Sequence, residues 1–156
     1  MSGRVVVIGV GNRFRRDDGF GPAVLDALAH TAPPDVWLYE SDGEPSRLLD
    51  MWEGADLAVV VETVRRGEAP GSVIELATEA RIETAGDGGA GGSHSLGLAD
   101  AVALGRVMDR LPHRLHVIGV EPSDLGQGPG LSDAVAAGVK AVASRVQDLV
   151  DTGRTP

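Results

Sequence analysis

Short apolar runs alternate along the chain with segments whose apolar positions recur every three or four residues. The runs have the length of strands, and most contain almost no polar residues, which indicates burial on both faces of a sheet. We expect the run over Ser72–Leu76 to lie near the sheet edge. The five predicted strands cover Arg4–Gly9, Val36–Glu40, Asp56–Val61, Ser72–Leu76 and Leu115–Val120.

The segments between the runs predict helices that would cover the two faces of this sheet. They are Gly21–His30, Ser46–Glu53, a helix opened by Ser93-His94-Ser95 that reaches about Arg110, and Leu131–Val150. Strands that alternate with helices predict a three-layer α/β/α sandwich. Its central sheet would be twisted, mostly parallel and built from about five strands.

No linker or internal repeat divides the chain, so residues 1–150 are predicted to form a single α/β domain. Residues 151–156 are predicted to be a flexible tail. Five of the seven residues from Gly86 to Gly92 are glycine, and we expect this segment to be mobile.

The formal net charge of −9 over 156 residues argues against a nucleic acid or an anionic membrane as partner, since both need a basic face. The absence of cysteine excludes disulfides, thiolate zinc sites and cysteine nucleophiles. No apolar run approaches the roughly 20 residues of a membrane span. The first predicted strand begins too close to Met1 for a signal peptide, so we expect a cytoplasmic location.

The loop from Gly9 to Gly21 is the first candidate for chemistry, because ligands bind at the carboxyl ends of strands in open α/β sheets. It contains four glycines and two adjacent acids, Asp17 and Asp18. Either acid could simply cap the following helix, where free N–H groups attract a carboxylate. Capping accounts less well for two adjacent acids in a loop flanked by glycines.

Glu62 and His94 are the other candidates. Glu62 directly follows the predicted strand that ends at Val61, and His94 opens a predicted helix whose dipole keeps the imidazole neutral. Taken singly, each could be an ordinary solvated or capping residue. Together with Asp18 they form a set of two carboxylates and one imidazole, which suits a divalent first-row metal such as nickel or zinc.

A dinucleotide site and a serine nucleophile are the competing interpretations. Gly9-Val10-Gly11 follows a strand and Glu40 ends the next one, as in a dinucleotide-binding unit. Phe14, however, occupies the third glycine position, and the loop is longer than a phosphate-binding turn. A G-x-S-x-G elbow is absent, which argues against a serine hydrolase.

Four blocks of this chain, in order, resemble those of the hydrogenase maturation endopeptidases. The first is Gly9–Asn12 with Asp17–Gly21, and the second is Val59–Glu62 with Ala69–Gly71. The third is Ser93–Asp100, and the last is Ile118–Pro122 with Gly130–Ser132. The resemblance covers nearly the whole chain, and four ordered blocks are far more specific than any single motif.

The resemblance implies an endopeptidase that removes the C-terminal extension of a nickel-iron hydrogenase large-subunit precursor. It implies that Asp18, Glu62 and His94 contact nickel that the precursor supplies, and that the enzyme is a monomer. Secondary, loop-shaping roles would fall to Gly11, Asn12, Asp17, Gly19, Gly21 and Asp42. A non-proteolytic protein that binds nickel or the precursor through the same site is the alternative.

Three departures from the family pattern bear on these roles. Glu62 stands where the family usually has aspartate, so its longer side chain must fold back in order to ligate. Glu44-Pro45 replaces part of an Asp-Gly-Gly-Thr run, which leaves the role of Asp42 open. Arg15-Arg16 stand where small or apolar residues are commoner, and could contact the precursor's extension or remain solvated.

Overall fold

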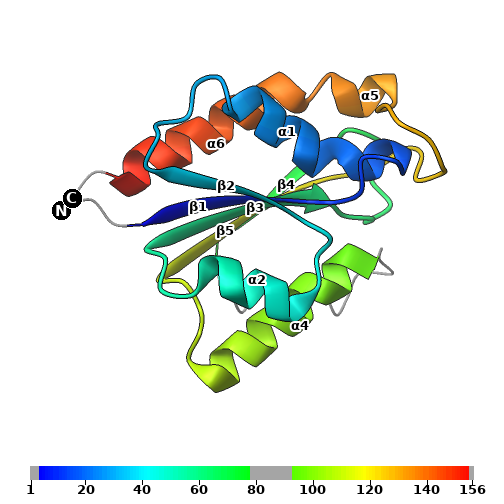
Figure 1. The fold of residues 1–156 in the computed structure, drawn as a ribbon. Coiled ribbons are helices and arrows are strands. Elements are labelled where there is room, and N and C mark those ends of the chain that lie inside the picture. The colour runs from blue at the N-terminus through cyan, green and yellow to red at the C-terminus, as the bar shows by residue number, and fades with distance from the viewer. Residues whose placement is uncertain (1–3, 78–92, 155–156) are drawn as a thin grey trace.

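The computed structural model describes residues 4–77 and 93–154, which form five strands and the helices that cover them (Figure 1). The strand order is β2-β1-β3-β5-β4, with β4 antiparallel to β5 and the other pairs parallel. The predicted edge position of the fourth strand is confirmed. The strands are β1 (Val5–Val10), β2 (Val36–Ser41), β3 (Leu57–Thr63), β4 (Val73–Leu76) and β5 (Arg114–Val120).

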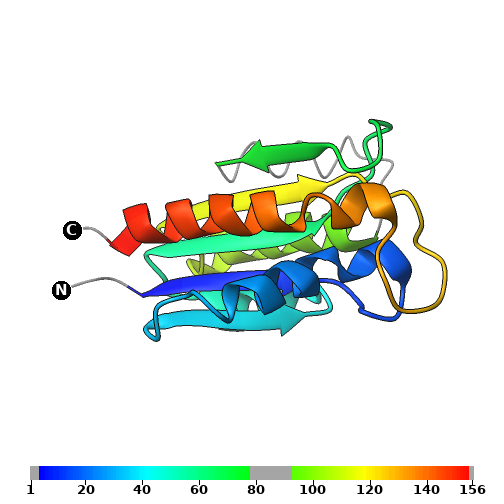
Figure 2. The same ribbon diagram turned by 90° about the horizontal axis from the view of Figure 1, so that it is seen from above.

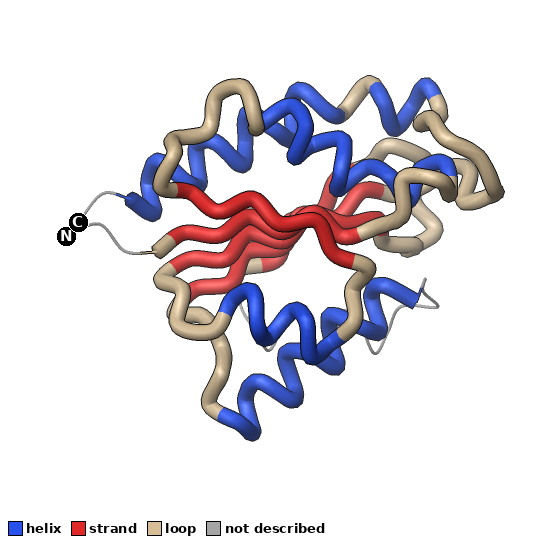
Figure 3. Tube along the Cα trace, in the orientation of Figure 1, coloured by secondary structure: helices blue, strands red, loops and turns tan. Residues whose placement is uncertain are grey.

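Helices cover both faces of the sheet, so the predicted three-layer α/β/α sandwich is confirmed (Figure 3). On one face lie α1, α5 and α6, and on the other lie α2 and α4 (Figure 1). A short 3-10 helix, η1, leads into α1. The helical elements are η1 (Arg16–Gly19), α1 (Phe20–Leu28), α2 (Pro45–Trp52), α4 (Ser93–Met108), α5 (Asp133–Ala136) and α6 (Val139–Arg154).

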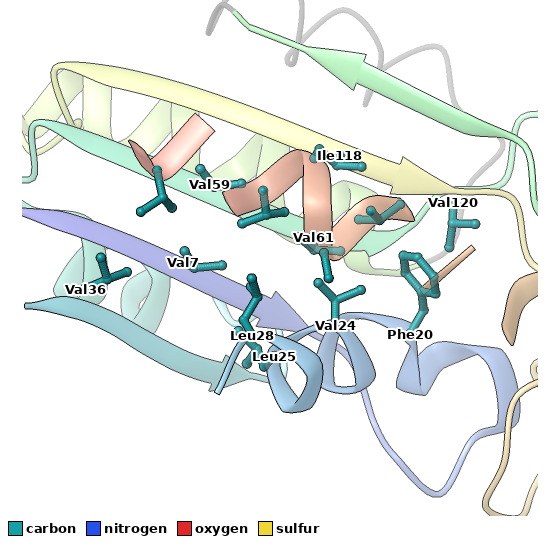
Figure 4. Packing of buried hydrophobic residues seen from close by; sticks show 14 of the residues in the cluster. Val7, Phe20, Val24, Leu25, Leu28, Val36, Val59, Val61, Ile118 and Val120 are labelled. Carbon is teal, nitrogen blue, oxygen red and sulfur yellow. The ribbon is translucent and has the colours of Figure 1, made fainter. Parts of the chain in front are cut away.

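The alternation of side chains along the strands divides the core into two apolar clusters. Val59 and Val61 of β3 pack with α1 and α6 on one face, where Phe20 is fully buried (Figure 4). Ala58 and Val60 pack with α2 and α4 on the other face. Because β1 and β3 contribute to both clusters, β1 and the Leu57–Val61 part of β3 are apolar at every position, as expected for buried parallel strands.

Two differences from the sequence prediction concern the third strand and the final helix. The third strand does not stop at Val61 but continues through Thr63, because Glu62 and Thr63 still pair with β5. The predicted final helix is interrupted at Ala137–Gly138 and forms α5 and α6. Glycine is about 1 kcal/mol less favourable than alanine within a helix, which favours a break there.

The predicted tail is wrong for Asp151–Arg154, since α6 continues through them. The predicted mobile segment, Gly86–Gly92, lies outside the described residues. In the described part of the chain, no helix is both long and apolar enough to cross a membrane.

Two glycines allow α1 to touch the sheet directly. A Cβ at Gly21 would lie 2.6 Å from the carbonyl oxygen of Val61 and 2.7 Å from the backbone nitrogen of Val10. A Cβ at Gly9 would lie 2.6 Å from the carbonyl oxygen of Gly21. This close approach sets the start of α1, and with it the position of the preceding loop.

We expect Gly21→Ala to lower the free energy of unfolding by about 3 kcal/mol, because the atoms it meets are backbone and cannot turn aside. Urea denaturation measures this loss. Gly138→Ala is the matched control, since its Cβ would meet only one carbonyl, at 3.6 Å. A Gly21→Ala protein as stable as the control would contradict the close packing.

Candidate active site

Buried polar side chains gather at one edge of the sheet. Among the described residues, the buried polar side chains are Asp17, Asp18, Ser41, Glu62, Thr63 and Glu121. Each one ends a strand or lies in the loop after it, at the carboxyl edge of the parallel strands. That edge is where open α/β sheets bind ligands, so these residues define the candidate site.

The carboxylate of Asp18 is 1% exposed and is held at the end of β3. Its Oδ2 accepts a hydrogen bond from the Asn12 backbone at 2.8 Å, and its Oδ1 accepts one from the Thr63 hydroxyl at 3.4 Å. A guanidinium nitrogen of Arg15 lies 4.0 Å from Oδ2. These contacts orient Asp18 toward the strand that carries Glu62.

The glycines of the loop make room for its own backbone rather than for a phosphate. Gly11 has a φ of 149°, and a Cβ there would collide with the carbonyl oxygen of Asp18. A Cβ at Gly19 would lie 3.3 Å from the Cα of Arg13. Because the chain itself fills the space beside Gly11, the glycines give no support to the dinucleotide interpretation.

Glu62 is the penultimate residue of β3 and is 1% exposed. Side chains alternate along a strand, so Glu62 shares the face of Val60, which α2 and α4 cover. Its partner on β5 is Gly119, which contributes no side chain. The sequence therefore identified a buried charged residue at this edge, although Glu62 lies inside the strand rather than after it.

His94 is the second residue of α4, and its side chain lies outside the described part of the structure. The first turns of α4 reach the same edge of the sheet, because Gly97 packs directly against the carbonyl oxygen of Gly43 (Figure 1). Within the described side chains, which do not include that of His94, no three acidic or histidine residues converge as a metal site.

Asp17 is fully buried and joins its loop to the loop after β5. Its carboxylate accepts hydrogen bonds from the backbone of Ser123, Asp124 and Ser132, and from the Ser132 hydroxyl, at 2.7–2.9 Å. Burial alone raises the pKa of this carboxyl, but the hydrogen bonds outweigh that effect and lower it. Asp17 is therefore a structural anchor and stays ionised.

Asp42 is 63% exposed and shapes the turn into α2. Its Oδ1 accepts from the Glu44 backbone at 3.0 Å, and its Oδ2 lies 3.3 Å from Arg47. Glu44 in turn caps α2 by accepting from the Ser46 and Arg47 backbone N–H groups. The Glu44-Pro45 departure thus begins a helix, and Asp42 supports that turn.

Glu121 is a buried carboxylate at this edge that the sequence reasoning did not select. It is 7% exposed, and its Oε1 accepts from the backbone of Arg66 at 2.8 Å and of Glu68 at 3.1 Å. The signal that selected Glu62, a charged residue where an apolar strand ends, also applies to Glu121. Its contacts show that it holds the β3–β4 loop.

A groove of about 360 Å³ lies beside the Asp18 loop. It runs between the β1–η1 loop and the start of α2, and its walls include Asn12, Phe14, Asp42 and Met51. Phe14 is 70% exposed at its rim. An exposed aromatic ring next to a groove offers apolar contact area to an extended chain.

Asp17→Asn should lower the free energy of unfolding at neutral pH by about 3 kcal/mol, because an amide cannot accept all four hydrogen bonds. Since the folded-state pKa is lowered, the stabilisation by the carboxylate is complete above its unfolded pKa of about 3.9 and is lost as the pH falls below it. Urea midpoints across the acid range measure this. Parallel profiles for wild type and variant would contradict the assigned role.

Comparison with known proteins gives a consistent result. The family model for hydrogenase maturation protease matches residues 24–149. The hydrogenase expression/formation protein HupD of Rhodobacter capsulatus is 30% identical over 150 residues, which cover 94% of this chain and 71% of that protein. The hydrogenase 2 maturation protease of Escherichia coli is 29% identical over 153 residues, which cover 92% and 88%.

Solved structures agree with the sequence relatives. The hydrogenase maturating endopeptidase HYBD from E. coli superposes with a TM-score of 0.85 at 25% identity, over 96% of this chain and 93% of that one. The family match and the structural match agree with each other, and the buried acids lie at the edge of the sheet where open α/β folds bind ligands. The chain belongs to the hydrogenase maturation protease family and is a peptidase.

Proposed function

We propose that this peptidase removes the C-terminal extension of a nickel-iron hydrogenase large-subunit precursor and recognises nickel that the precursor carries. The observation that supports this is the burial of Asp18 and Glu62, each 1% exposed, at the ligand-binding edge of the sheet. Carboxylates at this edge can ligate a divalent cation that reaches the site. A metal that arrives with the substrate would supply that cation.

The three side chains would act as ligands that complete the coordination of the arriving metal. Carboxylate oxygens and a neutral imidazole suit nickel, and His94 lies in the first turn of α4. Asn12 and Thr63 hold the Asp18 carboxylate in a fixed orientation before the substrate arrives. This preorganisation lowers the entropy cost of forming the complex.

The metal would also place the scissile peptide. A divalent ion beside a peptide bond polarises its carbonyl or activates a water, so recognition and hydrolysis would share one position. The groove along Asn12 and Phe14 offers a path for the chain next to the cleaved bond. We further propose that the protein acts in the cytoplasm as a monomer.

Asp18→Asn, Glu62→Gln and His94→Ala should each slow processing on the order of 100-fold or more, because each removes a ligand. Loss of the C-terminal peptide, followed by mass spectrometry of nickel-loaded precursor, measures the rate. Asp56→Asn is the control, since this carboxylate directly precedes β3 at the opposite edge of the sheet, and it should process at nearly the wild-type rate.

Glu62→Asp should retain most of the activity, because aspartate offers the same carboxylate at the position where the family usually has it. If Asp18→Asn and His94→Ala proteins fold normally and process the precursor as fast as wild type, the assigned site is wrong.

Precursor without nickel should not be cleaved, and adding nickel back to the precursor should restore cleavage. The physical reason is that metal and protease ligands together form the recognition contact. The experiment compares mass loss for the same precursor before and after nickel loading. Equal rates would contradict the requirement for nickel, and binding without cleavage would favour a non-proteolytic escort.

A further inference from the structure

Four exposed arginines follow the carboxyl ends of β1 and β3, at the edge of the sheet that carries the candidate site. They are notable in a chain whose net charge is −9. Arg15-Arg16 lie at the entry to η1 and Arg65-Arg66 lie on the β3–β4 loop, and we call these four side chains the cationic rim. Figure 2 shows both segments at the same end of the molecule. Both are tied to the site, because Thr63, two residues before Arg65, donates to the carboxylate of Asp18.

The first arginine pair is fixed by backbone contacts. Arg15 donates to the carbonyl oxygen of Leu125 at 3.4 Å, and Arg16 donates to that of Pro129 at 3.1 Å. Arg16 has a φ of 49°, unusual for a residue with a side chain, and its backbone N–H donates to Gly128 at 2.9 Å. These carbonyl contacts orient the two guanidiniums. Arg15 also lies 4.0 Å from the Asp18 carboxylate, which offsets part of its charge.

The second pair is carried on a loop whose backbone is fixed while its side chains remain available. The carboxylate of Glu121 holds this loop through the backbone of Arg66 and Glu68. Within the described chain, the side chains of Arg65 and Arg66 form no hydrogen bond or ion pair, and Arg66 lines a groove of about 220 Å³. Glu68 is the exposed acid on the same loop, and it offsets one of the two charges.

We propose that the cationic rim binds an acidic segment of the precursor next to the cleaved bond, an inference that rests on the proposed function. Guanidinium groups match carboxylates in geometry and charge, and fixed loops lose little entropy on binding. Neutralisation of a buried acid accounts for Arg15, which lies 4.0 Å from Asp18, but not for Arg65 and Arg66, which have no such contact.

The test is the double substitution Arg65→Gln and Arg66→Gln, which removes two exposed positive charges without disturbing a described side-chain contact. We expect the KM for nickel-loaded precursor to rise about tenfold at low salt, with kcat unchanged, because rim charges act on association. The salt dependence of KM should also shrink. Arg114→Gln, at the start of β5 and thus at the opposite edge of the sheet, is the control and should leave KM unchanged.

A second measurement identifies the chemistry of the bound segment. A short peptide of glutamates should inhibit the wild-type protein more strongly than the same peptide of glutamines, and the double variant should lose this difference. Unchanged KM and salt dependence in the double variant, or an equal change in Arg114→Gln, would overturn the inference. A wild-type protein that does not cleave at all would instead refute the proposed function.

Discussion

The carboxylate of Asp17 holds together the parts of the chain on which the site depends. It takes hydrogen bonds from residues 106 to 115 positions later in the sequence and so closes the loop after β1 against the loop after β5. Asp18 is the next residue, and its direction follows from that closure. The same segment carries Arg15 and Arg16. The Asp17 carboxylate therefore fixes the position of Asp18 and of these two arginines.

The buried acids at this edge serve two different purposes. Asp17 and Glu121 are surrounded by backbone N–H groups and fix loops in place. Asp18 and Glu62, each 1% exposed, lie at the end of β3 and are the carboxylates that we propose as ligands of a metal brought by the substrate. Buried carboxylates thus have a structural role at Asp17 and Glu121 and a proposed role in recognition at Asp18 and Glu62.

Glycine packing explains why this loop leaves no room for a bound phosphate. The contact of Gly21 with the backbone of Val10 and Val61 sets where α1 begins, and the Asp18 carbonyl fills the space beside Gly11. In a dinucleotide fold that space belongs to the ligand. Here the backbone occupies it, and the adjacent carboxylate is brought to the end of β3 instead.

The sequence alone determined the layers, the strands and the edge of the sheet at which Asp18, Glu62 and the start of α4 lie. The spacing of apolar residues predicts the strands and helices, and open α/β sheets bind ligands at the carboxyl ends of their strands. Both inferences need only the local sequence. Tertiary structure decided that the loop-shaping Asp17 joins the loop after β5, that Glu121 holds the β3–β4 loop, and that β3 extends through Thr63. These outcomes depend on hydrogen bonds between residues far apart in the chain, which no local pattern contains. The break between α5 and α6 escaped prediction for a related reason, since Val135 and Val139 keep the spacing of one continuous helix across it.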